Sequence, residues 1–325
     1  MSVRQVTSRR DLQRFIRYPY ELHKNDPHWV PPLRDAERER FDPKKNPFYQ
    51  HAVVDLFLAE RDGRTVGRVA GIDDDNHNAA HGDNLAFFGF FEAADEEVAL
   101  ELFKTVQTWA KARGRSLLRG PANPSMNDGS GFQLDAYDTD PYLMMPANPP
   151  AYPRYAEAAG FTKAKDLYAW LFDHHTADTA RLARLAARVE KRYTLSIRTA
   201  NLRRFDDELA TLKRLYNGAW EENWGFVRYT DAEFDALGRE LKLIVDPDVA
   251  LFLELSGQVV GVALSLPDAN QVFKRMNGRL LPFGWVQLLR RKQIINQARM
   301  PILGVVKEHR HKGLELILIH ETIKR

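Results

Sequence analysis

Residues 56–67 read LFLAERDGRTVG and residues 251–261 read LFLELSGQVVG, and this repeated pattern decides the fold. Each stretch begins with an apolar run, passes through a short turn that contains Gly63 or Gly257, and enters a second apolar run. Two such runs joined by a short turn with glycine are typical of a β-hairpin. The sequence therefore predicts one β-hairpin in each half of the chain.

The repeated pattern continues after the hairpins. Residues 87–114 and residues 302–325 each read as a short apolar strand, a charged turn and a helix. Hairpin, strand, turn and helix thus occur twice in the same order, which indicates an internal duplication. We expect an α/β protein with two domains in tandem, residues 1–175 and 176–325, each with a mixed central sheet flanked by helices.

The two copies differ in the length of chain after the repeated strand. The first copy continues through a helix closed by Gly160 and a further expected strand that ends near residue 172. In the second copy only 19 residues, 307–325, come after Val306. We therefore expect the second copy to be incomplete at its C-terminus within this sequence.

The composition excludes several classes of protein. The chain has 47 Lys and Arg against 44 Asp and Glu, a net charge of +3 that does not indicate a nucleic-acid binder. It contains no cysteine, which excludes disulfides, thiolate metal sites and a cysteine nucleophile. The first residues, MSVRQVTSRRDLQ, lack the apolar core of a signal peptide, and no apolar stretch has the length of a membrane span. A cytoplasmic protein is the expectation.

The turn before the last helix has the features of a phosphate site. An apolar strand ends at Val305 and Val306, and Arg310, His311, Lys312 and Gly313 precede Leu314 at the start of an apolar-periodic run. The first N–H groups of a helix have no partner within the helix and carry partial positive charge, so this position favours an anion. Cationic side chains and a glycine that permits close backbone approach strengthen the prediction.

This arrangement resembles the GNAT superfamily of acyl-CoA-dependent N-acyltransferases, whose pyrophosphate loop reads Q/R-x-x-G-x-G/A. Arg310 and Gly313 match that loop, whereas Glu315 stands in place of its final small residue. The helix at 152–161 is similar to the later helix of the same fold. The stretches 219–226 (AWEENWGF) and 266–284, with the PANP and NDGSG motifs, resemble a group of bacterial tandem GNAT-like proteins.

The resemblance implies a co-substrate and a site. Acetyl-CoA or a longer acyl-CoA would be held by Val305, Val306, Arg310, His311, Lys312, Gly313 and Leu314. The equivalent turn of the first copy, residues 92–97, carries four carboxylates and no glycine, so we expect this copy not to bind CoA. Glu315 opposes a diphosphate by its charge unless it only complements the helix dipole.

Polar residues in two loops are the candidates for the rest of the site. Asp128 and Glu222 are the candidate catalytic bases, because N-acylation requires a neutral amine. The candidates for substrate binding are Asn123, Asn127, Asn223 and Trp224. Structural alternatives stay open: residues such as Asn123 and Asp128 also make turns, and Trp224 is also suited to a core or a groove wall.

No metal is expected at the site. Residues 73–84 contain three consecutive aspartates, with His77 and His81 at helical ligand spacing. The stretch comes after a strand and reads as a polar connection, which is the interpretation we favour.

The segment 279–293 has two interpretations. It mixes Leu280, Phe283 and Trp285 with a basic end that contains Arg290 and Arg291. It is either a buried helix with a basic edge or a segment that contacts an anionic membrane peripherally.

The resemblance implies an N-acyltransferase that moves an acyl group from acyl-CoA, or from an acyl carrier, to an amine, either a small molecule or a lipid amine. The alternative is a catalytically inactive GNAT-fold binding protein.

Overall fold

The computed structural model describes residues 1–325, which form two compact units. The first unit comprises Met1–Leu167 and Val272–Leu289, and the second comprises Tyr168–Gln271 and Arg290–Arg325. The segment 272–289 lies in the second half of the sequence but packs in the first unit, where Arg34 N donates to Gly278 O at 3.1 Å. The boundary near residue 175 between the duplicated copies stays a prediction, since compact units record contacts and not duplication.

The first unit is built around one mixed sheet. The strands of the first unit are β1 (Ser2–Gln5), β2 (Ala52–Arg61), β3 (Arg64–Asp74), β4 (Leu85–Ala93), β5 (Leu117–Arg119), β6 (Ala122–Asn123) and β7 (Gly129–Ser130). The helices of this unit are α1 (Arg9–Leu22), α2 (Arg34–Arg40), η1 (Pro47–Gln50), α3 (Asp75–His81), α4 (Glu96–Ala112), α5 (Tyr152–Ala158) and α10 (Gly284–Leu289). The strand order is β1-β2-β3-β4-β5, antiparallel except for the parallel β4–β5 pair.

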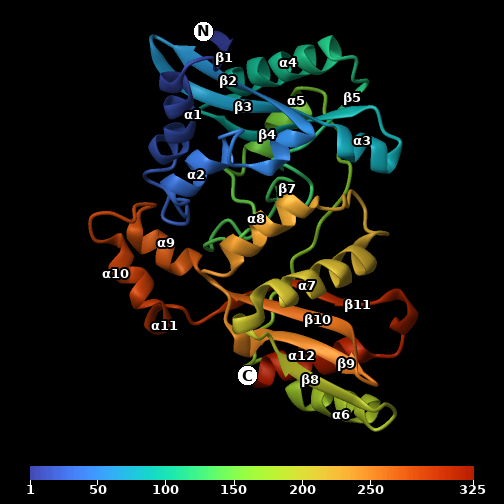
Figure 1. Cartoon of the computed structure of the whole chain (residues 1–325). Helices are drawn as coiled ribbons and strands as arrows, with labels where there is room; N and C mark the ends of the chain where they lie inside the picture. Colours follow the sequence, from blue (N-terminus) through green and yellow to red (C-terminus); the bar gives the residue numbers. More distant parts are fainter. The chain divides into compact units, whose positions relative to one another are not determined.

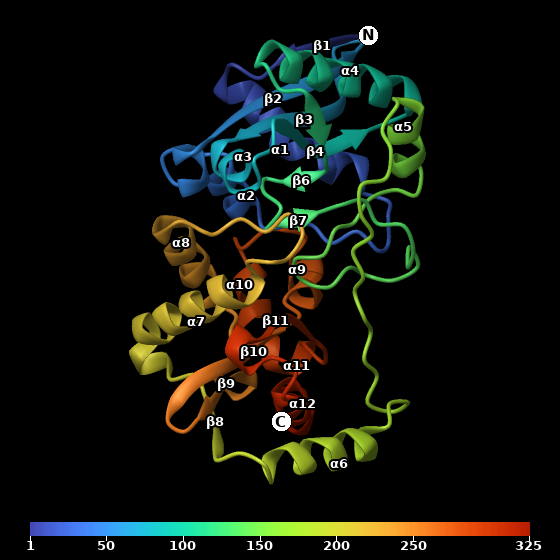
Figure 2. The same cartoon turned by 90° about the vertical axis from the view of Figure 1, so that its right-hand side faces the viewer.

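Each face of this sheet buries its own apolar cluster, as Figure 1 shows with α4 and α1 on opposite sides. On one face α4 inserts Val98, Leu102 and Val106, which recur at helical spacing, and α5 adds Tyr152. On the other face α1 inserts Phe15 and Ile16. Figure 2 shows α5 beside α4, on the same side of the sheet.

The second unit has a four-stranded antiparallel sheet of order β11-β10-β9-β8. Its strands are β8 (Leu195–Thr199), β9 (Ala250–Leu255), β10 (Gln258–Pro267) and β11 (Ala298–Val305). Its helices are α6 (Thr179–Glu190), η2 (Leu202–Arg204), α7 (Phe205–Trp220), α8 (Asp231–Leu241), η3 (Pro247–Val249), α11 (Arg291–Ile294), η4 (Lys307–His309) and α12 (Leu314–Lys324). The helix α9 (Asn270–Met276) begins in this unit and continues into the first. The helices α6 and α12 cover one face of the sheet, with Val189, Leu314 and Leu318 in the core.

The two sheets repeat one another in detail, which supports the duplication. Both hairpins turn through two residues of positive φ, Asp62-Gly63 and Ser256-Gly257. In both, one residue bulges out of the pairing, Val66 in β3 and Val260 in β10. The carbonyl of each bulge residue accepts from the first residue after the next strand: Ala94 N donates to Val66 O and Val306 N to Val260 O, both at 2.9 Å.

The expectation of a strand after Gly160 is wrong. Gly160 does close the helix, with a φ of +88°, but residues 161–172 pair with no strand. Apolar side chains of this stretch, among them Tyr168, Trp170 and Leu171, are exposed. An apolar run predicts a strand only if a neighbouring strand offers its backbone groups, and none does here.

Candidate functional site

The turn between β11 and α12 is the candidate phosphate site, and its backbone is open. Eight residues, 306–313, separate the last residue of β11 from the first of α12. Gly313 precedes the helix with a φ of +76° and supplies no side-chain cap to the first N–H groups. The start of α12 thus keeps the polar groups that favour an anion, as the sequence predicts.

The equivalent turn of the first copy is closed by its own carboxylate. Only Ala94 and Asp95 separate β4 from α4, and Asp95 Oδ1 accepts from Val98 N at 3.0 Å. Arg61 binds both oxygens of Asp95, and this contact lowers the pKa of the Asp95 carboxyl. A side-chain carboxylate therefore caps the helix start of the first copy, whereas no side chain caps the helix start of the second copy.

The cationic side chains of the second turn are bound by Glu222. Its Oε2 lies 2.8 Å from Arg310 Nη1 and its Oε1 lies 2.7 Å from Lys307 Nζ. These hydrogen bonds, that to Lys307 first, lower the pKa of Glu222. Glu222 is thus held as a carboxylate on Arg310, which was expected to bind phosphate, and on Lys307, which was not; a lower pKa makes Glu222 a weaker general base.

The other residues predicted to bind the cofactor differ in whether their side chains are paired, exposed or buried. Arg310 Nη2 also donates to Ala219 O at 2.9 Å, and Lys312 Nζ lies 2.6 Å from His309 Nδ1. His311 is exposed and adopts a φ of +64°. The side chains of Val305 and Leu314 are buried in the core, so these two residues offer a ligand only backbone groups.

The predicted candidates of the first unit mostly organise their own loop. Asn123 Oδ1 accepts from Phe90 N at 2.6 Å, while its Nδ2 donates to Gly129 O at 2.9 Å. Ser125 Oγ donates to Asp128 Oδ2 at 2.6 Å, and Asn127 N donates to Ser125 Oγ at 3.2 Å. The turn-forming interpretation of these residues therefore accounts for their contacts. Asp128 and Glu222 belong to different compact units.

Asn223 and Trp224 lie just after α7 and are both exposed. Asn223 N donates to Trp220 O at 2.9 Å, so a hydrogen-bonded turn follows the helix. The Trp224 side chain is 41% exposed. Trp220, by contrast, packs on β11, where an added Cβ at Gly304 would lie 2.5 Å from its ring. Residues 222–224 thus form an exposed polar and aromatic surface, and Glu222 joins this surface to the turn before α12.

Sequence reasoning missed one cluster of polar residues in the first unit. Glu92, near the end of β4, accepts from Tyr152 OH at 2.8 Å and lies 2.8 Å from His23 Nε2. Tyr152 OH also accepts from Ala93 N at 3.0 Å. Burial first, and Glu92 second, raise the pKa of the Tyr152 phenol well above its ordinary value. A charged residue inside the apolar run FFGFFEA was the available signal.

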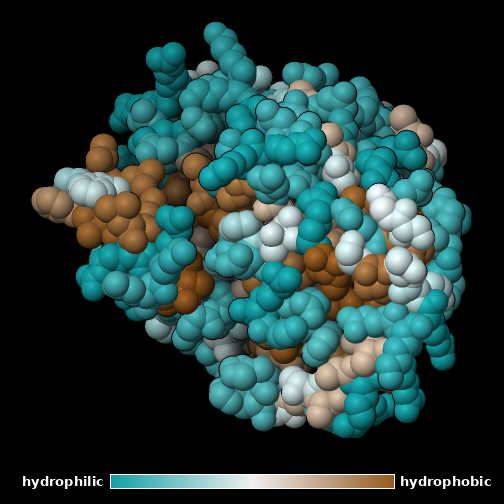
Figure 3. All heavy atoms as spheres, turned by 60° about the horizontal axis from the view of Figure 1, so that its bottom comes forward, coloured by the Kyte–Doolittle hydropathy of each residue, from teal (hydrophilic) through white to brown (hydrophobic).

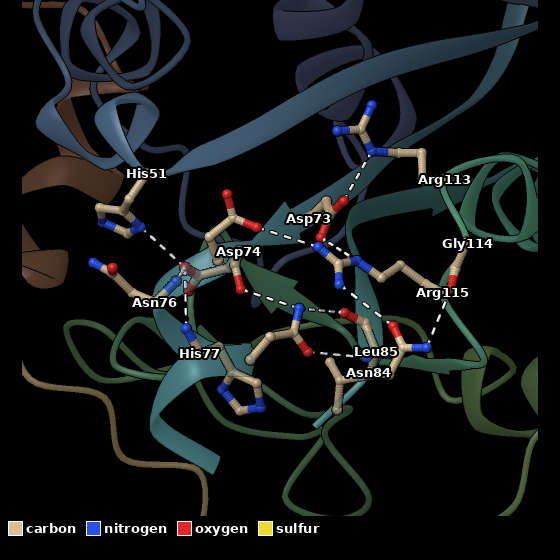
Figure 4. Close-up of polar contacts among 12 residues, drawn as sticks. His51, Asp73, Asp74, Asn76, His77, Asn84, Leu85, Arg113, Gly114 and Arg115 are labelled. Carbon is tan, nitrogen blue, oxygen red and sulfur yellow. Dashed lines mark hydrogen bonds and ion pairs between the residues drawn. The ribbon is translucent and has the colours of Figure 1, made fainter. Parts of the chain in front are cut away.

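The aspartates of 73–84 have structural partners, which Figure 4 shows. Asp73 accepts from Arg113 Nε at 2.9 Å and Arg115 Nε at 2.7 Å. Asp74 caps α3 and lies 2.9 Å from His51 Nδ1. The favoured interpretation, a polar connection, accounts for these contacts, although the stretch contains a short helix.

A different group, which the sequence did not single out, brings possible metal ligands together. One ligand atom each of Asp173, His174 and His175 lies within 4.8 Å of the others, and all three residues are exposed. The expected absence of a metal at the active site stays a prediction.

Two surface hollows of the second unit lie away from the turn. The smaller, about 340 Å³, is lined by residues of β8 and by Glu190, Tyr193 and Glu321. The larger, about 800 Å³, is open and is lined around residues 198–208. Neither of these two hollows is lined by residues 306–313.

Comparison with solved structures gives the class of protein. The chain superposes on a tandem GNAT protein from the clavulanic acid biosynthesis pathway, without acetyl-CoA, with a TM-score of 0.52. The match covers 99% of this chain and 84% of that chain at 15% sequence identity. The fold is therefore the tandem GNAT fold, and the predicted α/β class is confirmed.

Comparison of sequences gives the family. The chain is 37% identical over 315 residues to the bacterial ceramide synthase of Caulobacter vibrioides, which covers 95% of this chain and 81% of that protein. It is 34% identical over 311 residues to the protein YghO of Escherichia coli, covering 94% and 79% respectively. No family model matches the chain. The chain belongs to the family of bacterial tandem GNAT-like proteins that includes these two relatives.

Proposed function

We propose that the chain transfers an acyl group from acyl-CoA to the amine of a long-chain lipid. The family and the GNAT fold support N-acyl transfer, and a relative at 37% identity is named a ceramide synthase. A ceramide is an amide of a long-chain amine, so the same chemistry is proposed here. No helix of the structure combines the length and apolar character needed to cross a bilayer.

The open turn of the second copy is the observation that carries this proposal. Its helix start lacks the side-chain cap that closes the first copy, and Lys307 and Arg310 stand beside it. The pyrophosphate of CoA would take the hydrogen bonds that Glu222 now receives. Residues 305–314 would hold the cofactor, with Lys307 added to the predicted set.

The reaction needs no further co-reactant. The amine nitrogen attacks the thioester carbonyl, a C–N bond forms, and the C–S bond breaks. The electron pair of the C–S bond leaves with CoA as the thiolate, and one proton leaves the nitrogen. Asp128 and Glu222 remain the proposed bases, and the lowered pKa of Glu222 makes it a weaker base than an ordinary glutamate. Trp224 and Asn223 are proposed on the acceptor side, with Asn123 and Asn127 supporting the loop.

The test is an acyl-transfer assay with purified protein, a long-chain amino alcohol and palmitoyl-CoA. We expect an amide product by mass spectrometry with one free CoA thiol per amide. Replacing palmitoyl-CoA by acetyl-CoA, and the amino alcohol by a short polar amine, defines the preference for the acyl donor and for the acceptor. Arg310→Gln should weaken CoA binding, whereas Arg228→Gln, whose partner is Glu221, should not.

A catalytically inactive binding protein remains the second candidate, because Glu222 and Glu315 place two carboxylates near the turn. Calorimetric titration with CoA separates the two. Binding without amide formation favours the binding protein. Absence of both at millimolar CoA contradicts the acyl-CoA site itself.

A further inference from the structure

The first unit ends in an exposed apolar tip. We use this name for Leu281, Phe283, Trp285 and Leu289, on and before α10, which are 76%, 77%, 47% and 71% exposed. Figure 3 shows hydrophobic side chains that project from the surface where Figure 1 draws α10. The buried-helix interpretation of this segment is therefore wrong. Several large apolar side chains exposed together mark an interaction site more often than single ones do.

The tip is held in place by its own backbone. Trp285 N donates to Leu280 O at 2.9 Å and Val286 N to Phe283 O at 3.2 Å. A Cβ at Gly284 would lie 1.9 Å from Arg279 O, so the loop closes as tightly as a glycine allows. Val272 and Met276 of α9 are buried behind it. Exposure of the tip is thus a property of an ordered loop.

The base of the tip is attached to the first unit. A Cβ at Gly278 would lie 2.4 Å from Pro32 O, which shows how closely the two backbone segments approach. Lys274 forms an ion pair with Asp140. A fixed base and an ordered loop mean that the apolar side chains need no refolding before they contact a partner.

The charged residues next to the tip in the sequence all carry positive charge. Residues 269–307 contain no Asp or Glu but eight Lys and Arg, in a chain whose totals are 44 and 47. Arg275 and Arg279 precede the tip and are exposed. Arg290, Arg291 and Lys292 come directly after Leu289 in the sequence and are exposed as well. An exposed apolar segment whose charged neighbours in the sequence are all cations fits an anionic partner that has an apolar interior.

We propose that the apolar tip inserts into the surface of an anionic phospholipid bilayer. Leu281, Phe283 and Leu289 would enter the boundary of the acyl chains, with the amphipathic Trp285 at headgroup level and the cations on lipid phosphates. A second copy of the chain fits less well, because it would bring the exposed cations beside one tip against those beside the other. Docking extends the proposed function, since a lipid amine lies in such a bilayer, but it is measurable without catalysis.

The experiment is vesicle co-flotation of the full chain. Vesicles of phosphatidylcholine alone are compared with vesicles that also contain phosphatidylglycerol, at low and at high salt. We expect binding to the anionic vesicles, weaker at high salt. Arg290→Glu/Arg291→Glu should lower the partition coefficient at least about tenfold, since each cation contributes on the order of 1 kcal/mol near an anionic surface.

Two further variants test the tip itself. Leu281→Ser/Phe283→Ser should lower binding by about tenfold even at low salt, because it removes apolar area and no charge. Arg181→Glu/Arg184→Glu is the matched control, an equal charge change on two exposed residues of α6. Circular dichroism and thermal unfolding confirm that each variant folds, and Leu289→Ser replaces the double variant if it does not.

Three outcomes would overturn the proposal. The first is wild-type protein that stays with neither vesicle at low salt. The second is loss of binding in the α6 control while the tip variants still bind. The third is a concentration-dependent dimer without lipid that Phe283→Ser dissociates, which would assign the tip to contact between copies. In each case the amide assay can still succeed, so failure of docking and failure of the proposed function are distinguishable.

Discussion

Glu222 and Arg310 are joined by a hydrogen bond of 2.8 Å between a carboxylate oxygen and a guanidinium nitrogen, and the second carboxylate oxygen binds Lys307. A side chain from the end of α7 thus neutralises the turn before α12. A phosphate that bound there would have to displace a carboxylate of the same sign, so under the proposed function Glu222 would lower the affinity for CoA.

We expect Glu222→Gln to bind CoA several-fold more tightly than wild type by calorimetry, since the amide keeps the shape but no longer competes as an anion. Glu221→Gln is the control, because Glu221 pairs with Arg228 and acts on Lys307 of the turn only through its charge, without a hydrogen bond. Turnover should be measured with both. If Glu222 is the base, Glu222→Gln binds CoA but makes little amide. Unchanged CoA affinity in Glu222→Gln would contradict the competition.

Substitution of Gly313 probes the backbone of the same turn, and we expect the substitution to lower stability. Its φ is +76°, and a Cβ would lie 3.1 Å from Val189 Cγ2 on α6. We expect Gly313→Ala to lower the free energy of unfolding by about 1–2 kcal/mol. Gly257→Ala, at a φ of +81° with open space around it, isolates the conformational part. If Gly313→Ala and Gly257→Ala lose the same free energy of unfolding in urea, the new contact with Val189 costs no stability.

Two helical glycines of the second unit should respond in opposite directions. Gly218 in α7 has no atom within 4 Å of an added Cβ, so Gly218→Ala should stabilise by about 0.5–1 kcal/mol. At Gly238 in α8 the same Cβ would lie 2.4 Å from Leu209 Cδ2, and Gly238→Ala should destabilise. Thermal unfolding of both variants tests this prediction. A shift of the melting temperature with the same sign in both would contradict the close contact between Gly238 and Leu209.

Tyr152 should contribute to stability through its hydroxyl. Tyr152→Phe removes one donor to Glu92, which keeps His23 at 2.8 Å, and removes the hydroxyl that accepts from the buried Ala93 N. We expect a loss of about 1–3 kcal/mol in urea unfolding. Tyr155→Phe, on the same helix, is the control and should change stability by less than half of that. A neutral Tyr152→Phe would imply that water replaces the hydroxyl.

His77 should make the first unit less stable in mild acid. Burial, and then the neighbouring His81, lower the pKa of His77 below its ordinary 6.5. The unfolded chain therefore binds the proton more readily than the folded chain. The contribution of neutral His77 to the free energy of unfolding is fully present above pH 6.5, and it is lost as the pH falls through the folded pKa. The slope for one group is at most about 1.4 kcal/mol per pH unit. His77→Gln should flatten the pH profile of thermal unfolding, whereas the exposed His175→Gln should leave it unchanged.

The repeated elements could be predicted from the sequence because their signals are local. Turn glycines at 63 and 257 and apolar runs on both sides specify a hairpin without knowledge of the rest. The position of 272–289 could not be predicted, since contact of Gly278 with Pro32 joins residues far apart in the chain. The role of Glu222 was also beyond reach, because its partners lie 85 and 88 residues away.

The same locality explains the one false strand. Residues 161–172 have the composition of a strand, but pairing depends on a neighbour that composition does not reveal. The candidate cofactor residues were predicted from a turn pattern, and the structure shows which of them expose side chains. Val305 and Leu314 face the core because an apolar residue beside a helix start serves packing first.

The chain passes between its two compact units three times, at 167–168, 271–272 and 289–290. A gene cut at the duplication boundary would therefore separate the first unit from the eighteen-residue return that covers Pro32. Halves expressed alone would each carry an uncovered surface, and their poor yield would say nothing about either active site. Circular permutation or a split with 272–289 restored to the first half is the informative dissection.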